Sequence, residues 1–129
     1  MLCSVGTGTT LAGIIGSALP NQRIMGFSAV ADPNVNEKLQ NLYPSHNNWT
    51  LHADYTFGGF AKFTHELIDY VYDFYDEYNI ALDVVYTAKM MYGLRHLLAE
   101  KYFTTDNKIL CIHTGGVQGN AGFGVNVYE

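Results

Sequence analysis

A glycine- and threonine-rich stretch near the start of the chain carries the strongest chemical signal in the sequence. It follows a short apolar run, Met1–Val5, and leads directly into an apolar segment with helical periodicity. A turn of this kind offers free backbone N–H groups, hydroxyl donors and a helix N-terminus to one small anion. An ordinary tight turn between a strand and a helix is the simpler alternative. We interpret the stretch as a phosphate-binding loop made of Gly6, Thr7, Gly8, Thr9 and Thr10.

Two nucleotide-binding patterns fit this loop less well than a site for a single phosphate. The dinucleotide fingerprint requires a third glycine three residues after the second, and Leu11 stands there. A nucleoside-triphosphate loop requires Gly-Lys-Ser/Thr, and the first lysine of the chain is Lys38. Asp32, at the end of the next predicted strand, could still hold a ribose. A non-catalytic phosphate- or nucleotide-binding α/β module is therefore the alternative function.

Strand-like and helix-like apolar patterns alternate along the chain and must position this loop. Strands are predicted at 1–5, 23–30, 49–55 and 108–113, and helices at 9–19, 34–43, 64–78 and 86–102. Residues 117–129 are glycine-rich and read as a loop or a frayed tail. The alternation predicts one α/β domain over 1–129, a partial three-layer structure with a parallel sheet and helices on both faces.

Ligands in such sheets bind at the carboxyl ends of the strands. Two glycine-rich strand ends, Gly6–Thr10 and Thr114–Gly116, should therefore face one site. Three residues near these ends also have a purely structural interpretation. Asp83 would start a helix, Tyr86 would pack into the core, and His113 would be a structural hydrogen-bonding group.

The composition argues against several functional classes. A chain of 129 residues with 48% hydrophobic residues can pack one domain. Its net charge of −5 and its scattered basic residues argue against a nucleic-acid partner. It has neither an apolar run of roughly 20 residues nor a secretory leader, so we expect a cytoplasmic, non-membrane protein. Cys3 and Cys111 stand in apolar runs and should be buried free thiols, while the histidines show no metal-ligand spacing.

Three segments, taken in order, resemble one family of pyridoxal-phosphate enzymes. They are Gly6–Gly13, Asp83–Lys89 and Ile112–Gly116, and Phe57–Lys62 and Glu66–Asp69 also look similar. The family comprises the 1-aminocyclopropane-1-carboxylate deaminases and D-cysteine desulfhydrases. The resemblance covers nearly the whole chain and implies a remnant of the larger domain of a tryptophan-synthase-β-like fold. It also implies pyridoxal 5'-phosphate as cofactor and a small amino acid as substrate, converted to a 2-oxo acid and ammonia.

The resemblance also implies roles for individual residues. The backbone from Gly6 to Thr10 would hold the cofactor phosphate, and Tyr86 would lie beside the cofactor ring and substrate as a catalytic residue. Thr87 and Thr114 would be cofactor-binding positions that differ between branches of the family. Cyclopropane deaminases tend to carry Glu and Leu there, so two threonines favour the desulfhydrase side.

Some positions depart from the family pattern. Phe60 stands where an active-site tyrosine is often found, Val84 where proline is usual, and Ala88 where glycine is usual. None of the five lysines matches the motif of the Schiff-base lysine, which the family carries in its amino-terminal half. We therefore expect a carboxyl-terminal fragment that is inactive alone. A homo-oligomer or a companion chain could supply the missing half.

Overall fold

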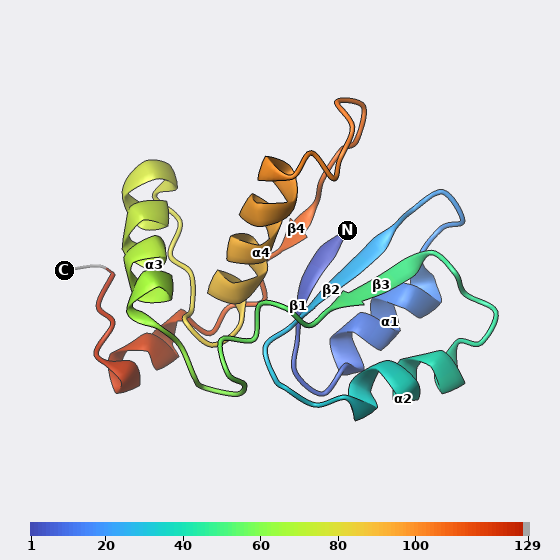
Figure 1. The fold of residues 1–129 in the computed structure, drawn as a ribbon, viewed down its shortest axis with the longest axis horizontal. Coiled ribbons are helices and arrows are strands. Elements are labelled where there is room, and N and C mark those ends of the chain that lie inside the picture. The colour runs from blue at the N-terminus through green and yellow to red at the C-terminus, as the bar shows by residue number, and fades with distance from the viewer. Residues whose placement is uncertain (128–129) are drawn as a thin grey trace.

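A four-stranded parallel sheet organises the computed structural model, which describes residues 1–127 (Figure 1). Its strands lie in the order β3-β2-β1-β4. Leu2 of β1 is in register with Met25 of β2 and with Cys111 of β4, and all pairs are parallel. All carboxyl ends therefore lie at one edge of the sheet. The strand bounds are β1 Leu2–Val5, β2 Ile24–Ser28, β3 Trp49–His52 and β4 Cys111–Ile112.

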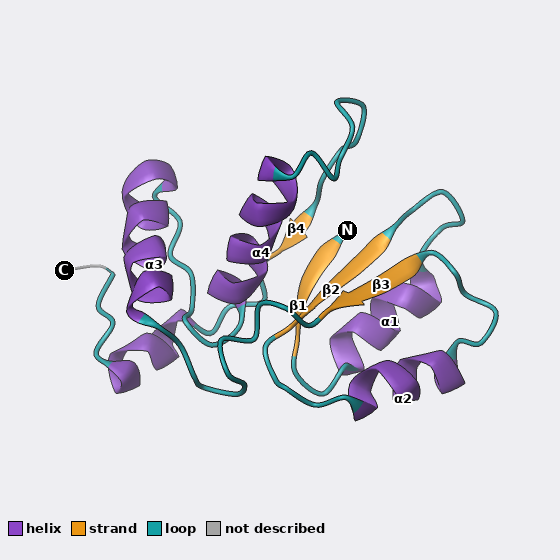
Figure 2. Ribbon diagram, in the orientation of Figure 1, coloured by secondary structure: helices purple, strands orange, loops and turns teal. Residues whose placement is uncertain are grey.

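Helices cover both faces of the sheet, which confirms the predicted α/β architecture (Figure 2). Helices α1 and α2 pack on one face. Helix α4 packs on the other face against β1 and β2, and α3 packs against α4. The bounds are α1 Thr9–Ser17, α2 Asn34–Leu42, α3 His65–Tyr78 and α4 Thr87–Ala99. None of the helices in residues 1–127 is both long and apolar enough to cross a membrane.

The last strand is shorter and more exposed than the sequence predicts. Only Cys111 and Ile112 pair with β1, whereas Ile109 and Leu110 are exposed. β4 lies at an edge of the sheet with only β1 beside it, and an apolar run in the sequence does not show whether a strand has a neighbour on each side. Cys3 is buried as expected, but Cys111 is only half-buried, and both thiols are free. The segment Val117–Phe123 forms a 3-10 helix, η1, and residues 128–129 of the predicted tail lie outside the described part.

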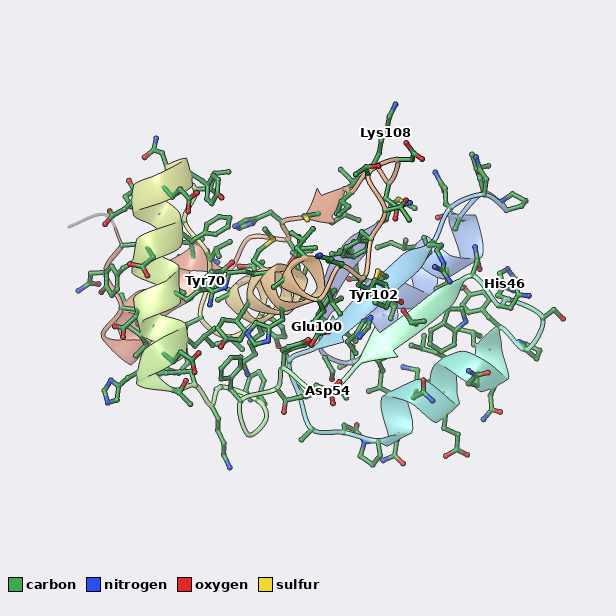
Figure 3. All side chains as sticks on the ribbon, turned by 45° about the horizontal axis from the view of Figure 1, so that its top comes forward. His46, Asp54, Tyr70, Glu100, Tyr102 and Lys108 are labelled. Carbon is green, nitrogen blue, oxygen red and sulfur yellow. The ribbon has the colours of Figure 1, made fainter. Side chains whose placement is uncertain are left out.

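Aromatic side chains join α3 to α4. Tyr70 extends from α3 toward α4 (Figure 3). The Arg95 guanidinium carbon lies 4.4 Å from the centroid of the Tyr70 ring. The Tyr92 ring meets the Tyr70 ring edge-on, with 5.4 Å between the two centroids. Burial raises the pKa of Tyr70 to about 12. These contacts fix the outer helix to the helix that lies on the sheet.

The His52 ring should make the stability of the fold depend on pH. Its Nε2 is buried without a hydrogen-bond partner within residues 1–127, and the ring stacks on Phe27 at 5.0 Å. Burial lowers the pKa of His52, against the opposing effect of the Asp54 carboxylate. The folded state therefore binds this proton less readily than the unfolded state, and stability falls as the pH drops through the unfolded-state pKa.

We expect the wild-type chain to lose more stability than His52→Phe when the pH is lowered from about 7 to about 5. The phenyl ring keeps the stacking on Phe27 and has no nitrogen to protonate. Urea unfolding of both chains across this range measures the difference, and other titrating groups cancel in the comparison. Parallel losses in the two chains would show that His52 does not contribute.

Candidate functional site

Three segments meet at the carboxyl edge of the sheet. A β-carbon built on Gly6 would lie 3.3 Å from Cε1 of Tyr86, so the tyrosine ring lies directly on the loop after β1. A β-carbon on Gly116 would lie 3.1 Å from Cγ of Asp83, so the loop after β4 lies against the start of α4. The structure therefore brings the two glycine-rich strand ends to one edge, as the sequence predicts.

The loop after β1 leaves the N-terminus of α1 open. Gly8 is the residue that precedes the helix, and its φ of 88° lies in the left-handed region that favours glycine. No side chain caps the helix, and its first turn contains no acidic residue. The first backbone N–H groups of a helix have no acceptor within it. Thr7, Thr9 and Thr10 are exposed beside them, and the Thr7 and Thr9 hydroxyl oxygens lie 3.1 Å apart.

Lys38 adds a positive charge to this loop. Its Nζ lies 3.5 Å from the Thr7 carbonyl oxygen. Helix α2 brings it there because Val35 and Leu39 of the same helix are buried against α1 and the sheet. Open N–H groups, hydroxyls, a helix dipole and a nearby ammonium together make a donor set that fits a phosphate group.

Asp83 shapes the turn that leads into α4. The carboxylate is buried and accepts hydrogen bonds from the backbone N–H groups of Val85 at 3.1 Å, Tyr86 at 2.7 Å and Thr87 at 2.8 Å. It also accepts a hydrogen bond from the Thr87 hydroxyl at 2.6 Å. The structural interpretation of Asp83 is thus confirmed, since the carboxylate accepts hydrogen bonds from the free N–H groups at the start of this helix.

Tyr86 and Thr87 differ in their access to a ligand. Tyr86 is half-buried rather than part of the core, and its ring centroid lies 6.3 Å from that of the exposed Phe60. Thr87 is fully buried, and its hydroxyl is engaged with Asp83. The position of Tyr86 at the edge suits a residue beside a ligand. Direct contact of either side chain with a cofactor stays a prediction.

Polar side chains from the end of the chain hold the segment before α4. His113 Nε2 contacts the Ala81 carbonyl oxygen at 2.8 Å, while its Nδ1 accepts the N–H of Gly115 at 3.0 Å. The structural interpretation of His113 is therefore confirmed. Asn120 of η1 donates to the Leu82 oxygen and accepts from the Val84 nitrogen. Thr114 is exposed in the loop between them, and its role as a cofactor contact stays a prediction.

Comparison with known proteins relates this geometry to one family. The chain matches no protein-family model. It is 30% identical, over 98% of its length, to a Pyrococcus abyssi protein provisionally named a 1-aminocyclopropane-1-carboxylate deaminase. A similarly named Pyrococcus furiosus protein is 39% identical over 71 residues, which is 55% of this chain and 21% of that protein. The crystal structure of an ACC deaminase homologue superposes on 95% of this chain with a TM-score of 0.81 and 31% identity.

This chain belongs to the 1-aminocyclopropane-1-carboxylate deaminase family. It spans 42% of the Pyrococcus abyssi protein and 41% of the homologue in the crystal structure. The region shared with these two relatives therefore covers nearly all of this chain.

Two residues of this deaminase-family chain have contacts that sequence reasoning did not assign. Lys89 is fully buried, and its Nζ donates to three backbone carbonyl oxygens. Burial lowers the pKa of Lys89 to about 8, against the opposing effect of the Asp83 carboxylate. Asp32 is the candidate ribose ligand, but its carboxylate accepts the N–H of Asn34 at the start of α2. This contact gives an aspartate at position 32 a structural role that needs no ribose.

Proposed function

We propose that this chain forms the phosphate-binding part of a pyridoxal-phosphate site in a deaminase or desulfhydrase. The parent reaction would convert a small amino acid to a 2-oxo acid and ammonia. The observation that supports it most strongly is the open N-terminus of α1, with Gly8, Thr7, Thr9, Thr10 and Lys38, next to the half-buried Tyr86. Membership of the deaminase family supports the same cofactor.

The residues present fit the phosphate end of this cofactor. The N–H groups at the start of α1 and the hydroxyls of Thr7, Thr9 and Thr10 would hold the phosphate, and Lys38 would balance its charge. Pyridoxal phosphate, when bound, supplies an electron sink for a bond broken at the amino-acid α-carbon. Tyr86 would pack beside the ring, because its own ring already lies on Gly6.

The two threonines support the desulfhydrase branch in this proposal. A glutamate near a pyridine nitrogen would favour its protonated form, whereas a threonine hydroxyl offers only a neutral hydrogen bond. The Thr87 hydroxyl already donates to the Asp83 carboxylate at 2.6 Å. It also accepts the backbone N–H of Asp83 at 2.9 Å, so the hydroxyl is held in place and has one lone pair left with which to accept from a ligand.

Covalent chemistry on this cofactor requires an amine, and we assign that amine to none of the lysines of this chain. Lys89 Nζ donates to three carbonyl oxygens and therefore carries three hydrogens. In this ammonium form the nitrogen has no lone pair with which to attack a cofactor. We therefore propose that a polypeptide segment outside residues 1–129, such as one on a companion chain, supplies the amine. The chain by itself would then bind the phosphate end and show no turnover.

A stable probe tests this function without the missing amine. Phosphopyridoxyl-alanine carries the ring, the phosphate and an amino acid in one molecule, and its fluorescence reports binding. We expect the purified chain to bind it and Thr9→Glu to bind it at least about tenfold more weakly, because the carboxylate would occupy the helix N-terminus and repel phosphate.

The stability of this variant separates a lost site from a damaged fold. A glutamate in the first turn of α1 should raise the free energy of unfolding by about 0.3–1 kcal/mol through the helix dipole. Gln40→Glu, the same change of charge on the exposed surface of α2, should leave binding as in the wild type. Wild-type binding of NADH without binding of phosphopyridoxyl-alanine would contradict the proposal and favour a nucleotide-binding module.

A further inference from the structure

Lys89 lies in the first turn of α4, and its ammonium group is surrounded by backbone oxygens. Its Nζ donates to the Thr56 carbonyl at 2.8 Å, the Gly59 carbonyl at 2.9 Å and the Ala29 carbonyl at 3.1 Å. An ammonium group has three donors, so each hydrogen has an acceptor. Lys89 thus joins α4 to the end of β2 and to the turn at residues 56–61.

This turn has an unfavourable backbone conformation. Phe57 and Ala61 have φ values of 53°, although neither is glycine, and Gly58 and Gly59 also have positive φ values. Such conformations persist only where the surrounding structure holds them. Lys89 binds two carbonyl oxygens of this turn. The same two oxygens accept the N–H groups of Gly59 and Lys62 at 3.1 and 3.2 Å.

The turn presents one large aromatic side chain at the candidate site. Phe60 is 61% exposed, and its ring centroid lies 6.3 Å from that of Tyr86. Tyr86 in turn lies on Gly6 of the phosphate-binding loop. A planar ring bound with its phosphate at that loop would therefore have two aromatic neighbours, one of which depends on the turn for its position.

We propose that Lys89 is a positioning residue, whose ammonium group holds the 56–61 turn against β2 and so keeps Phe60 beside Tyr86. Lys89 does not touch the ligand in this scheme, and it acts through the turn. The identity of the ligand, a phosphate ester of a planar aromatic ring, rests on the proposed function. The effect of Lys89 on the turn is independent of the proposed function.

The variant Lys89→Met removes the ammonium group and keeps an unbranched apolar stem. We expect the amide hydrogens of Gly59 and Lys62 to exchange at least about tenfold faster in this variant, while those of α1 and α3 keep their rates. The nuclear Overhauser contact between the Phe60 and Tyr86 rings should also disappear. Lys62→Met is the matched control, because Lys62 is exposed in the same region and its ammonium has no hydrogen bond within residues 1–127.

The outcomes separate a local role from a general one. Unchanged exchange at Gly59 and Lys62, or equal acceleration in α1 and α3, would overturn the proposal. If Lys89→Met does not fold, the wild-type chain decides. Its Lys89 ammonium hydrogens should give slowly exchanging signals at mildly acidic pH, with contacts to Thr56 and Gly59, and their absence would overturn it.

Binding of phosphopyridoxyl-alanine tests the link to the site. Lys89→Met should bind it about tenfold more weakly than Lys62→Met, because Phe60 is no longer held beside Tyr86. Equal binding by the two variants would overturn the positioning role. If the wild-type chain does not bind the probe, the proposed function fails, while the exchange of Gly59 and Lys62 still decides whether Lys89 holds the turn.

Discussion

Asp83→Ala should lower the free energy of unfolding by about 3 kcal/mol. The carboxylate is buried and accepts four hydrogen bonds, from the backbone N–H groups of Val85, Tyr86 and Thr87 and from the Thr87 hydroxyl. Removing it leaves these donors without an acceptor where solvent reaches them poorly, and each such loss costs about 1–3 kcal/mol before the turn relaxes. Urea denaturation followed by circular dichroism measures the change.

The amide variant Asp83→Asn refines this prediction. Asparagine keeps one acceptor oxygen and replaces the other with an NH₂ group that cannot accept from Thr87. Its loss of stability should therefore lie between that of wild type and Asp83→Ala, at about 1–2 kcal/mol. Asp69→Ala, at an exposed position of α3, is the control and should change stability by less than about 0.5 kcal/mol. Similar results for Asp83→Ala and Asp69→Ala would show that the carboxylate does not hold the turn.

The turn that Asp83 holds also positions residues of the candidate site. Asp83 fixes the direction in which Tyr86 leaves the start of α4, and Gly116 of the opposite loop packs on the same carboxylate. Asp83→Ala should therefore also weaken binding of phosphopyridoxyl-alanine. The residue does so by positioning its neighbours, because its own oxygens are occupied by backbone and hydroxyl donors.

Local signals in the sequence predict much of this fold. The helix predicted at residues 64–78 is observed at His65–Tyr78, and Thr64 caps it because its hydroxyl oxygen accepts the N–H of Leu67 at 3.3 Å. The other helices show an apolar period because one face of each is turned to the core, whereas β1 and β2 are buried on both faces and show as short apolar runs. The loop at Gly6–Thr10 was recognisable because its glycines, its threonines and its following helix are neighbours in sequence.

Contacts between distant residues explain what the sequence does not predict. Lys89 binds an oxygen of Ala29, 60 positions away, and Asn120 binds the backbone of Leu82 and Val84 from 38 and 36 positions away. A lysine in an apolar helix or an asparagine in a glycine-rich segment carries no local sign of such a partner. The exposure of Ile109 and Leu110 also goes with the place of β4 at the sheet edge, and the order of the strands decides that place.

Helix α4 lies so close to the sheet at Gly93 that added volume there should lower the stability of the fold. Gly93 of α4 lies over Phe27 of β2, and a β-carbon there would be 2.6 Å from Cε1 of Phe27 and 2.8 Å from Cδ2 of Tyr55. Phe27 is fully buried and also stacks on His52, so its ring has little room to move away. Extra volume in such a place forces the helix outward or strains the side chains.

We therefore expect Gly93→Ala to lower the free energy of unfolding by about 2 kcal/mol, even though alanine favours a helix. Gly13→Ala is the matched control within α1, where a β-carbon would meet nothing within 4 Å. It should raise stability by about 0.5–1 kcal/mol through helix propensity alone. Urea unfolding of the two variants gives shifts of opposite sign if α4 rests on β2 as described, and gains in both would contradict that contact. Tyr86, Thr87 and Lys89 all stand at the start of α4. The contact at Gly93 therefore also sets how close these three residues lie to the carboxyl edge of the sheet.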